Sequence, residues 1–451
     1  MKAIRRGVVT LLAGATLGLA SCDTVDRLLE AENPAAIGEG QLDSEALIGV
    51  LVNSTIGALS AGYDDPFIWQ GSMFTDEQVT GINWEGTARL NLRVVQYDGA
   101  GPPDVFNWAS RFRFMADSVS GRLRSLLKEP AKDRRMALVL AHAGYSYTLM
   151  AEIMCEATIN VGDKIYSPKE LAQLAIPRFE EAITIATAVG SSATDVLNLA
   201  RVGLARAALL TGDKAKVMSA AQQVPENFVW WVEYLVNVQS NVMQGRVTGT
   251  NHALGVHPRF LNGTFGTQNL RTGQTDPRIQ HTVSWTTGHN QLTKLYKPYQ
   301  SLPYSGYNGA VIATGGTPIL YEQSTDIKLA SGLEARHHYY EAAGPTGTGP
   351  NGSTLDFVNA RRTFGKQTTA ALTGDALMSE LREQRARDMY LGGFRLGDLR
   401  RWAAAGITDP RQTFPTGTHP NPEWGPYGNA TCYPIPLSEY IGNPNIKRTT
   451  S

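Results

Sequence analysis

The amino-acid sequence predicts a mainly α-helical protein in which tetratricopeptide-like helical hairpins carry a loop-rich, irregular half with a few short strands. Small and apolar residues recur at helical spacing over several segments, and capping residues, Gly or Pro mark the ends of these segments. Two other stretches are rich in Gly, Thr and Asn and show no such periodicity. With 42% hydrophobic and 18% charged residues among 451, the composition is that of a folded protein rather than a disordered one.

The amino terminus has the pattern of a lipoprotein signal peptide. Basic residues precede an apolar run over residues 8–20, which is shorter than the roughly 20 residues that a membrane-spanning helix needs. The run ends in Leu19-Ala20-Ser21-Cys22, which resembles the lipobox of bacterial lipoproteins. We therefore expect residues 1–21 to be removed and Cys22 to carry acyl chains that anchor the protein to a membrane. The alternative is a plain secretory peptide with a chance cysteine.

Net charge and cysteine content exclude two classes of protein. The full chain has 41 basic and 41 acidic side chains, and loss of Lys2, Arg5 and Arg6 leaves 38 basic ones (41 minus 3), so the mature chain is slightly acidic. The chain has no excess of basic residues, so its charge gives no indication of nucleic-acid binding. Beyond Cys22, Cys155 and Cys432 are too few for a disulfide framework. They can pair, but a buried free thiol at Cys155 is the expected state.

The strongest helical signals lie in the first half of the chain. Residues 136–156 place small and apolar side chains along one face. The next helix begins at Ser167, Pro168 and Glu170, which provide a capping box and a proline at the first helical position. Pro177 lies inside this helix and is expected to kink it.

A helix, a Gly-Asp turn, a second helix and a proline follow in that order. Residues 197–210 and 214–223 read as the two helices, with Thr211-Gly212-Asp213 as the turn and Pro225 after the second. This order resembles a tetratricopeptide repeat, although its spacing is degenerate. We expect repeat-like hairpins rather than a regular array, with further helix pairs covering their apolar faces.

Helical signals return near the carboxyl end. Gly392-Gly393 interrupts a charged helical segment there, and a Gly/Pro loop at residues 344–352 separates two earlier helices. The expected helices are 326–342, 354–362, about 375–391 and 394–404.

No linker or charge run divides the helices from the irregular stretches, so residues 22–451 are interpreted as one domain. Long irregular segments of a compact domain are usually functional loops. We therefore expect a loop-rich ligand region at about 63–109 and 244–323. The helical scaffold is expected at about 40–62, 110–243 and 326–405.

Catalytic motifs are absent or weak, so we expect neither an enzyme nor a cofactor. The sequence has no zinc-protease helix motif, P-loop or nucleophile elbow. Glu334 with His338, and His337 with Glu341, are i,i+4 pairs, but the two pairs project in different directions around a helix and do not converge on one metal ion. A solvated helix face is the expected role of this cluster.

Two acidic pairs and a glycine pattern also carry no clear chemistry. Asp64-Asp65 and Asp76-Glu77 have side chains suited to general acid–base work, but turns or helix caps are their expected positions. Gly347, Gly349 and Gly352 satisfy a G-x-G-x-x-G pattern that follows a helical segment rather than a strand, so it is interpreted as a plain loop.

A family resemblance appears at the carboxyl end. Residues 381–402 read LREQRARDMYLGGFRLGDLRRW, which resembles the ERxRE...EGxRxxDLxRW signature of SusD/RagB-family nutrient-uptake lipoproteins. Gly392 stands where the family has an acidic residue, so the chain resembles a divergent member. Shorter matches occur in the family's order at 74–77 (FTDE), 276–278 (DPR), 354–361 (TLDFVNAR), 433–439 (YPIPLSE) and 443–445 (NPN).

This resemblance implies a lipid-anchored protein of the outer membrane, facing the cell surface. It implies capture of an oligosaccharide, or in some members a peptide, for a TonB-dependent SusC-like transporter, without catalysis. The sequence leaves open which ligand is bound and whether a structural calcium is present. Two alternatives remain: a structural lipoprotein that holds protein partners, and a divergent glycan hydrolase.

The aromatic and amide residues of the loop-rich stretches are the expected ligand contacts. Sugar rings present flat C–H faces and a fringe of hydroxyls, so their sites combine exposed aromatic planes with amide and charged groups. An aromatic residue in such a loop can equally belong to a small satellite core. The candidates are Trp69, Asn83, Trp84, Arg89, Trp285, Gln291, Tyr296, Tyr299, Tyr304 and Tyr307.

The charged carboxyl-terminal signature also has a structural interpretation. Arg385, Arg395, Asp398 and Arg400 place opposite charges on a helical segment whose apolar residues, including Trp402, are expected to face inward. Such a set is expected to fix helix packing through charge-assisted hydrogen bonds rather than to contact ligand.

Overall fold

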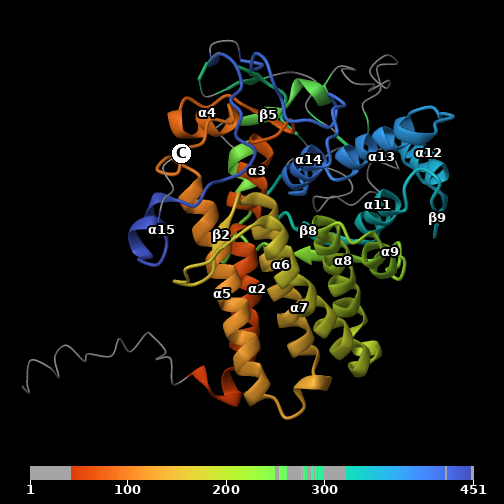
Figure 1. Cartoon of the computed structure of the whole chain (residues 1–451). Helices are drawn as coiled ribbons and strands as arrows, with labels where there is room; N and C mark the ends of the chain where they lie inside the picture. Colours follow the sequence, from red (N-terminus) through yellow and green to blue (C-terminus); the bar gives the residue numbers. More distant parts are fainter. Residues whose placement is uncertain are drawn as a thin grey trace, which may run out of the picture. The chain divides into compact units, whose positions relative to one another are not determined.

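The computed structural model of the chain is shown in Figure 1. It describes residues 42–248, 253–261, 276, 278–279, 281, 286–288, 290–291, 293–298, 321–421 and 424–447. Cys22 and the signal peptide lie outside the described residues. The chain divides into two units, Met1–Ile48 and Gly49–Ser451. The described part of the first unit contains the short 3-10 turn η2 (Glu45–Leu47), where the Ser44 side chain accepts a hydrogen bond from Ala46 N.

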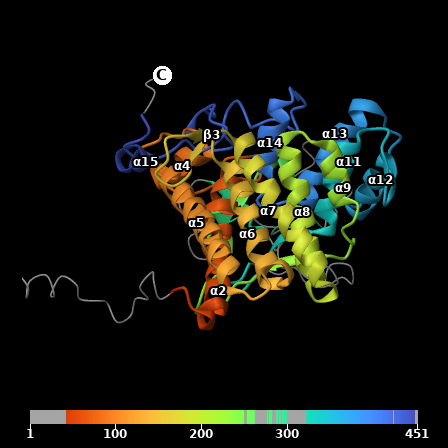
Figure 2. The same ribbon diagram turned by 60° about the horizontal axis from the view of Figure 1, so that its bottom comes forward.

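Helices dominate the described part of the chain. Consecutive helices from α5 to α9 pack against one another, and α11 packs on both α8 and α9 (Figure 2). This packing confirms the predicted helical hairpins. The earlier helices are α2 (Ile48–Gly62), α5 (Pro102–Leu126), α6 (Arg134–Ile153), α7 (Pro168–Val189), α8 (Thr194–Thr211) and α9 (Lys214–Ala221). The later ones are α11 (Gly332–Ala343), α12 (Thr354–Phe364), α13 (Gly374–Asp388), α14 (Arg395–Ala404) and α15 (Leu437–Gly442).

The predicted helix ends are confirmed where the sequence carries capping residues. Ser167 and Glu170 form the capping box of α7, with Ser167 N donating to the Glu170 carboxylate at 2.9 Å. The helix continues through Pro177 as far as Val189. Gly212 ends α8 in the left-handed conformation (φ 81°), and the Asp213 side chain caps α9 by accepting from Lys216 N at 3.0 Å.

Close packing of α6, α7 and α8 depends on two glycines around one aromatic ring. A Cβ at Gly144 of α6 would lie 2.7 Å from the ring of Phe179, and a Cβ at Gly203 of α8 would lie 2.2 Å from it. The edge of the Tyr145 ring contacts the same ring at a centroid distance of 5.2 Å. Phe179 on α7 therefore fills the space that the two glycines leave, which fixes how near the three helices approach.

The prediction of a helix over residues 326–342 is wrong in its first part. Residues Ile327–Ser331 form strand β8, which pairs antiparallel with β4 (Val229–Val232), and α11 begins only at Gly332. A Cβ at Gly332 would lie 2.2 Å from the carbonyl oxygen of Pro225, so this point requires glycine. The backbone partners come from nearly a hundred residues earlier in the chain, which a local pattern does not reveal.

The loop-rich half contains more helix than the sequence predicts. Residues 63–109 include the start of α5 at Pro102, and short elements occupy much of the remainder. These are the π-helix η3 (Tyr63–Ile68), α3 (Trp69–Met73), β1 (Gln78–Thr80) and α4 (Glu85–Asn91). The middle stretch contributes the π-helix η6 (Gln244–Thr248), β5 (Leu254–Val256), the 3-10 turn η7 (Pro258–Phe260), β6 (Thr286–Thr287) and β7 (Lys294–Leu295).

Two short hairpins and a disulfide complete the described fold. The hairpins are β2 (Ala157–Thr158) with β3 (Ile165–Tyr166), and β9 (Thr348–Gly349) with β10 (Gly352–Ser353). Cys155 is bonded to Cys432, so the expectation of a free thiol at Cys155 is wrong. Main-chain bonds support the same junction, because Cys155 N donates to the carbonyl oxygen of Tyr433 at 2.8 Å. The end of α6 is thus fixed to the carboxyl-terminal segment, 277 residues away in sequence.

One helical stretch, Glu45–Met73, is long and apolar enough to cross a membrane by length and composition alone. Core helices of soluble proteins meet the same criterion. In this stretch, 44% of the most apolar 18-residue segment is buried within the fold. Leu51, Val52 and Leu59 on this stretch are core residues.

Candidate ligand-binding site

The two loop-rich stretches lie against each other. Strand β1 pairs antiparallel with β5, which joins the early stretch to the middle one. Val256 N, at the end of β5, donates to the carbonyl oxygen of Tyr296 at 2.9 Å. Asn290 N donates to the carbonyl oxygen of Gly81 at 2.7 Å, and a Cβ at Gly81 would lie 2.8 Å from the Cα of Gly288. Residues 78–84 are therefore held next to the β6–β7 hairpin.

A pocket of about 270 Å³ opens where these strands meet the segment before α15. Its walls combine apolar side chains with amide, hydroxyl and ammonium groups, which is the composition of a small polar-ligand site. The lining residues are Val79, Val256, Pro258, Leu261, Thr293, Lys294, Pro420 and Asn421.

The early candidate residues are exposed beside this hairpin. Trp84 precedes α4 and keeps 49% of its surface accessible, and Asn83 is also exposed. The Arg89 side chain, one turn into α4, is exposed and forms an ion pair with Glu85 at 3.1 Å. It also donates to the Gln96 amide oxygen at 3.2 Å. Residues 83–89 therefore expose an aromatic plane, an amide and a guanidinium group, which are kinds of group that sugar sites combine.

The middle stretch contributes two further candidates. Gln291 is exposed and has a left-handed backbone (φ 62°) in the turn between β6 and β7. Tyr296 is half-buried, and its ring meets His281 edge-on at a centroid distance of 5.5 Å. Trp285, Tyr299, Tyr304 and Tyr307 lie outside the described residues.

The structure does not place Trp69 at this surface. Only 5% of Trp69 is exposed, and the Arg246 guanidinium stacks 4.0 Å from the centre of its ring. Arg246 is itself paired with Asp65 at 3.3 Å. Trp69 therefore packs beneath the loops as a core residue, which is the alternative that the sequence left open.

An aromatic cluster near the carboxyl end was missed by the sequence analysis. The His419 ring contacts Trp424 and Tyr427, both at centroid distances of 5.1 Å. His419 Nε2 lies 2.8 Å from the Asn91 side-chain oxygen at the end of α4, which links this segment to the early loops. Burial lowers the pKa of His419 to about 4, so the ring is neutral at physiological pH. The segment has no periodicity, and only its density of aromatic residues was available as a signal.

Asp76 lies in the turn before β1, as expected, and Glu77 in the bend that follows it, but both side chains are buried. Asp76 receives hydrogen bonds from Arg259 at 2.6 Å and from Arg395 at 2.7 Å. Burial alone would raise the pKa of Asp76, but the two guanidinium groups hold it below its usual value. The Glu77 carboxylate instead accepts a hydrogen bond from Leu391 N at 2.8 Å. Burial raises the pKa of Glu77 to about 8.

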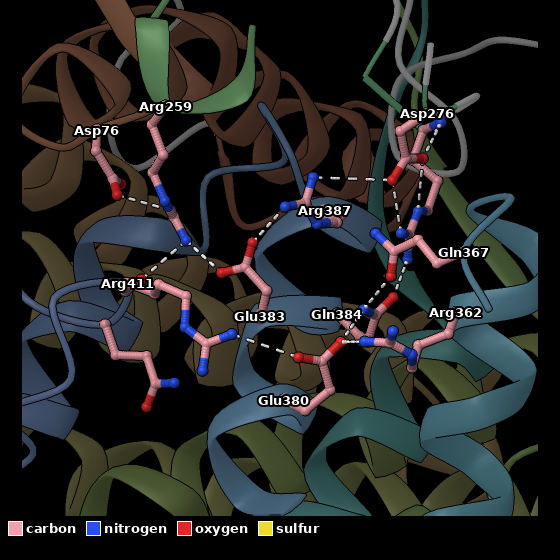
Figure 3. Close-up of polar contacts among 12 residues, drawn as sticks. Asp76, Arg259, Asp276, Arg362, Gln367, Glu380, Glu383, Gln384, Arg387 and Arg411 are labelled. Carbon is pink, nitrogen blue, oxygen red and sulfur yellow. Dashed lines mark hydrogen bonds and ion pairs between the residues drawn. The ribbon is translucent and has the colours of Figure 1, made fainter. Parts of the chain in front are cut away.

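Helix α13 ties both parts of the middle stretch to the scaffold through buried ion pairs (Figure 3). Arg259 of η7 donates to Glu383 at 2.5 Å. Arg278 is bonded to Asp276 at 2.7 Å and to Asp388 at 3.1 Å. All five side chains are at most 5% exposed. Asp276 and Arg278 therefore hold this part of the middle stretch on α13, and these charges serve packing.

Asp64 and Asp65 lie in the π-helix η3 rather than in a turn. Asp64 is buried and accepts from Val242 N at 2.6 Å, while Asp65 pairs with Arg246. Burial raises the pKa of Asp64 to about 6. Both carboxyl groups thus fix η3 to residues 242–246.

The prediction of a solvated face at residues 334–341 is wrong as well. Glu334, His337 and His338 are at most 1% exposed. His338 Nε2 lies 3.1 Å from Glu334, whereas His337 Nε2 lies 2.8 Å from Asp388 rather than meeting Glu341. Within the part of the chain that the structure describes, no group of three or more His, Cys, Asp or Glu is arranged to hold a metal ion.

The packing role predicted for the charged signature is confirmed. Arg385 donates to Asp398 at 2.7 Å, and Arg400 donates to the carbonyl oxygen of Glu152 at 2.7 Å. Phe394 and Trp402 are each 1% exposed. These groups join α13, α14 and α6 to one another.

Comparison with known proteins finds similar structures but no similar sequences. No family model matches the chain, and no curated protein sequence is similar to it. Solved structures are similar over about 90% of this chain. One is a SusD superfamily protein from Parabacteroides distasonis, at 15% identity and a TM-score of 0.64, covering 90% of this chain and 99% of the other.

Two further similar structures are of proteins described by the class of ligand that they bind. A SusD-like carbohydrate binding protein from Bacteroides fragilis has 14% identity and a TM-score of 0.63, covering 90% of this chain and 99% of that one. A putative sugar binding protein from Bacteroides vulgatus has 14% identity and a TM-score of 0.61, covering 90% and 98%. The chain therefore has the SusD-like fold, in agreement with the predicted mainly helical, tetratricopeptide-like architecture.

Proposed function

We propose that this protein is a surface-exposed lipoprotein of the outer membrane that binds an oligosaccharide nutrient and delivers it to a TonB-dependent SusC-like transporter. The observation that carries the proposal is the SusD-like fold over about 90% of the chain, which includes solved carbohydrate-binding proteins. In this function the chain binds and hands over its ligand, and catalysis is not required.

The exposed chemistry of the loop-rich half supports a sugar as ligand. Trp84 offers a wide aromatic plane, and Asn83, Arg89 and Gln291 offer exposed hydrogen-bonding groups on the two stretches that the Asn290–Gly81 hydrogen bond joins. The neighbouring pocket, about 270 Å³, lies just below the roughly 300–1,000 Å³ usual for ligand sites, so we expect it to hold only a small part of the ligand.

The covalent chemistry of the chain supports export from the cytoplasm. The Leu-Ala-Ser-Cys sequence at residues 19–22 supports a lipid anchor at Cys22. The Cys155–Cys432 disulfide is a bond of oxidising compartments such as the periplasm or the cell surface. Both features fit a lipoprotein that leaves the cytoplasm before it folds.

Binding of oligosaccharides to the purified mature protein tests the proposal. We expect titration calorimetry to detect binding of at least one glycan from an array. We expect Trp84→Ala and Tyr296→Ala each to weaken it about tenfold, because loss of an aromatic stacking plane removes about 1.4 kcal/mol. Phe114→Ala, an exposed aromatic on α5, is the matched control. If both substitutions leave glycan affinity unchanged, the placement of the site is wrong.

The same preparation distinguishes the two other functions. A structural lipoprotein that holds only protein partners would bind no glycan in the array. A glycan hydrolase would release new reducing ends from oligosaccharides, and the binding protein that we propose would not.

A further inference from the structure

A tight turn at residues 235–239, shortly after strand β4, exposes a group of aliphatic side chains. Leu235 keeps 61% of its surface accessible, Val236 52% and Val238 81%, and Asn237 is the one polar side chain among them. Residues 234–245 carry no charged side chain. Single apolar residues are normal at a protein surface, whereas a contiguous group of them marks an interaction site.

The backbone of this turn is hydrogen-bonded to itself. Leu235 N donates to the carbonyl oxygen of Gln239 at 2.9 Å, and Val238 N and Gln239 N each donate to the carbonyl oxygen of Leu235 at 3.0 Å. Hydrocarbon offers no water to replace a missing partner, so a backbone enters it only where its polar groups are bonded internally. The internal bonds of the turn therefore suit it to an apolar environment.

Groups typical of a membrane interface lie just before the turn. Trp231 is half-buried, and the ammonium of Lys328 on β8 lies 5.1 Å from the centre of its ring. The backbone from Trp231 to Leu235 spans at most about 14 Å. Tryptophan and lysine are the residues that lie at the level of the lipid headgroups when neighbouring apolar residues enter the acyl region.

The charge at the base of the turn is mixed. Glu233 is exposed between Trp231 and the turn, and Asp326 accepts a hydrogen bond from Tyr234 N at 2.8 Å. These carboxylates oppose the ammonium of Lys328, so the turn lacks the cluster of basic residues that attracts anionic lipids. A layer of zwitterionic headgroups, which presents charges of both signs, suits this base.

The size of the apolar group favours a lipid surface over a protein partner. The three exposed side chains offer on the order of 300 Å², whereas a stable protein interface buries about 800 Å² on each partner. A bilayer needs no matching surface. The proposed anchor at Cys22 already keeps Leu42 within about 70 Å of the bilayer, because about 20 residues of chain reach no further. The turn therefore needs only to add to an attachment that the anchor provides.

We propose that the turn at residues 235–239 inserts into the bilayer that carries the lipid anchor. Leu235, Val236 and Val238 lie below the headgroups in this arrangement, and Trp231 lies among them. The inference rests on the proposed lipoprotein function and adds a second contact with the membrane. Two contacts fix the orientation of the protein on the membrane, which a single point of attachment does not. The turn alone is too small for stable anchoring.

A fluorescent probe on the mature, lipidated protein in phosphatidylcholine vesicles tests this inference. With Cys22 acylated and Cys155 bonded to Cys432, a thiol-reactive, environment-sensitive dye attaches to Val238→Cys at position 238 only. We expect nitroxide groups on the acyl chains to quench this dye at least about threefold more than the same dye on Val161→Cys, because only a group below the headgroups meets the quencher. Val161 is the matched control, since it is 58% exposed between β2 and β3.

Equal quenching at the two positions would overturn the proposal. Adding Val236→Asp to the protein labelled at position 238 should abolish the quenching, because a charge in the acyl region is strongly disfavoured, and unchanged quenching would also overturn it. Val236 and Val238 are exposed, so neither substitution removes core packing.

Flotation of the protein with the vesicles reports the anchor separately. Protein that floats while the dye at position 238 is not quenched contradicts only the insertion of the turn. Protein that does not float contradicts the proposed lipoprotein, and the insertion fails together with it.

Discussion

At the scale of single residues, burial decides what the charged side chains of this chain do. Asp76, Glu77 and Glu334 look like turn, cap or surface residues in the sequence, and each is at most 4% exposed in the structure. Charged groups remain inside only when partners compensate their lost hydration. Asp76 has two arginines in contact, whereas Glu77 relies on a main-chain N–H and shows the opposite pKa shift.

The raised pKa of Glu77 predicts a pH dependence of stability. Its pKa is about 8 in the folded protein and 4.5 as the ordinary value, so the folded state binds a proton more tightly than the unfolded one. The resulting stabilisation is complete below about pH 4.5 and is lost as pH rises toward 8. We expect the free energy of unfolding in urea to fall between pH 6.5 and 8, and to fall less in Glu77→Gln, which keeps the acceptor for Leu391 N.

This pH window separates Glu77 from the two histidines whose pKa values are lowered to about 4. Burial lowers the pKa of His257 and of His419 to about 4, and their contribution changes only below pH 6.5, where acid destabilises the fold. Glu129→Gln, an exposed position, serves as the control and should retain the wild-type difference between pH 6.5 and 8. An equal fall in Glu77→Gln and wild type would contradict the assignment.

At the scale of elements, close contacts made by glycines and one disulfide fix how helices, strands and the carboxyl-terminal segment meet. Gly332 lies where β8 becomes α11, against the carbonyl oxygens of Pro225 and Glu226. The Cys155–Cys432 bond joins the end of α6 to the last segment of the described chain. In both places the contact comes from a segment far away in sequence.

Gly332→Ala is predicted to be strongly destabilising. The added Cβ would lie 2.2 Å from a backbone oxygen, and backbone cannot rotate out of the way as a side chain can. We expect a loss of about 2–3 kcal/mol in urea denaturation, at the upper end of the cost of overpacking. Gly121→Ala on α5 is the matched control, because nothing lies within 4 Å of its added Cβ and alanine favours a helix by up to about 1 kcal/mol.

Removal of the disulfide is predicted to lower stability by about 2–5 kcal/mol, because a cross-link between distant positions restricts the unfolded chain. Cys155→Ser with Cys432→Ser should show this loss in denaturation under non-reducing conditions, and added reductant should bring wild type to the same level. Two thiols that react with an alkylating agent in the unreduced, denatured wild-type chain would show that the bond is not formed.

At the scale of the whole molecule, the fold combines a scaffold of helical hairpins with a loop-rich half that is attached to it through buried ion pairs. The helices α5 to α9 pack in chain order, and the buried arginines of the middle stretch attach it to α13 (Figures 2 and 3). Rigid attachment of irregular loops allows them to present Trp84 and its neighbours in a defined arrangement.

The lipid anchor is predicted to hold this whole unit at the membrane. We expect Cys22→Ser to move the protein from the membrane fraction to the soluble fraction of cells, and to abolish incorporation of a labelled fatty acid, because several acyl chains are needed for stable anchoring. Substitution of Ser21 by Ala keeps the small residue before the cysteine and should change neither result. A membrane-bound, unlabelled Cys22→Ser protein would contradict the proposed anchor.

The sequence alone determined the features that depend on local chemistry. Capping residues and 3.6-residue periodicity gave α6 to α9, α12 and α14, because these signals act over a few residues. The order of short motifs along the chain indicated the SusD-like fold that the solved structures share. Trp84, which is exposed, and Tyr296, which is half-buried, could also be named as candidate ligand contacts, because aromatic residues in polar loops form a recognisable pattern.

Only the tertiary structure decided the features that depend on partners distant in sequence. Strand β8 formed where a helix was predicted because β4 supplies its hydrogen bonds, and Trp69 became a core residue because Arg246 stacks on it. The Cys155–Cys432 pairing and the buried charges of Asp76 and Glu334 have the same origin. Each depends on which groups are in contact in the folded protein. Those contacts, rather than the neighbours in sequence, determine the free energies of desolvation and pairing.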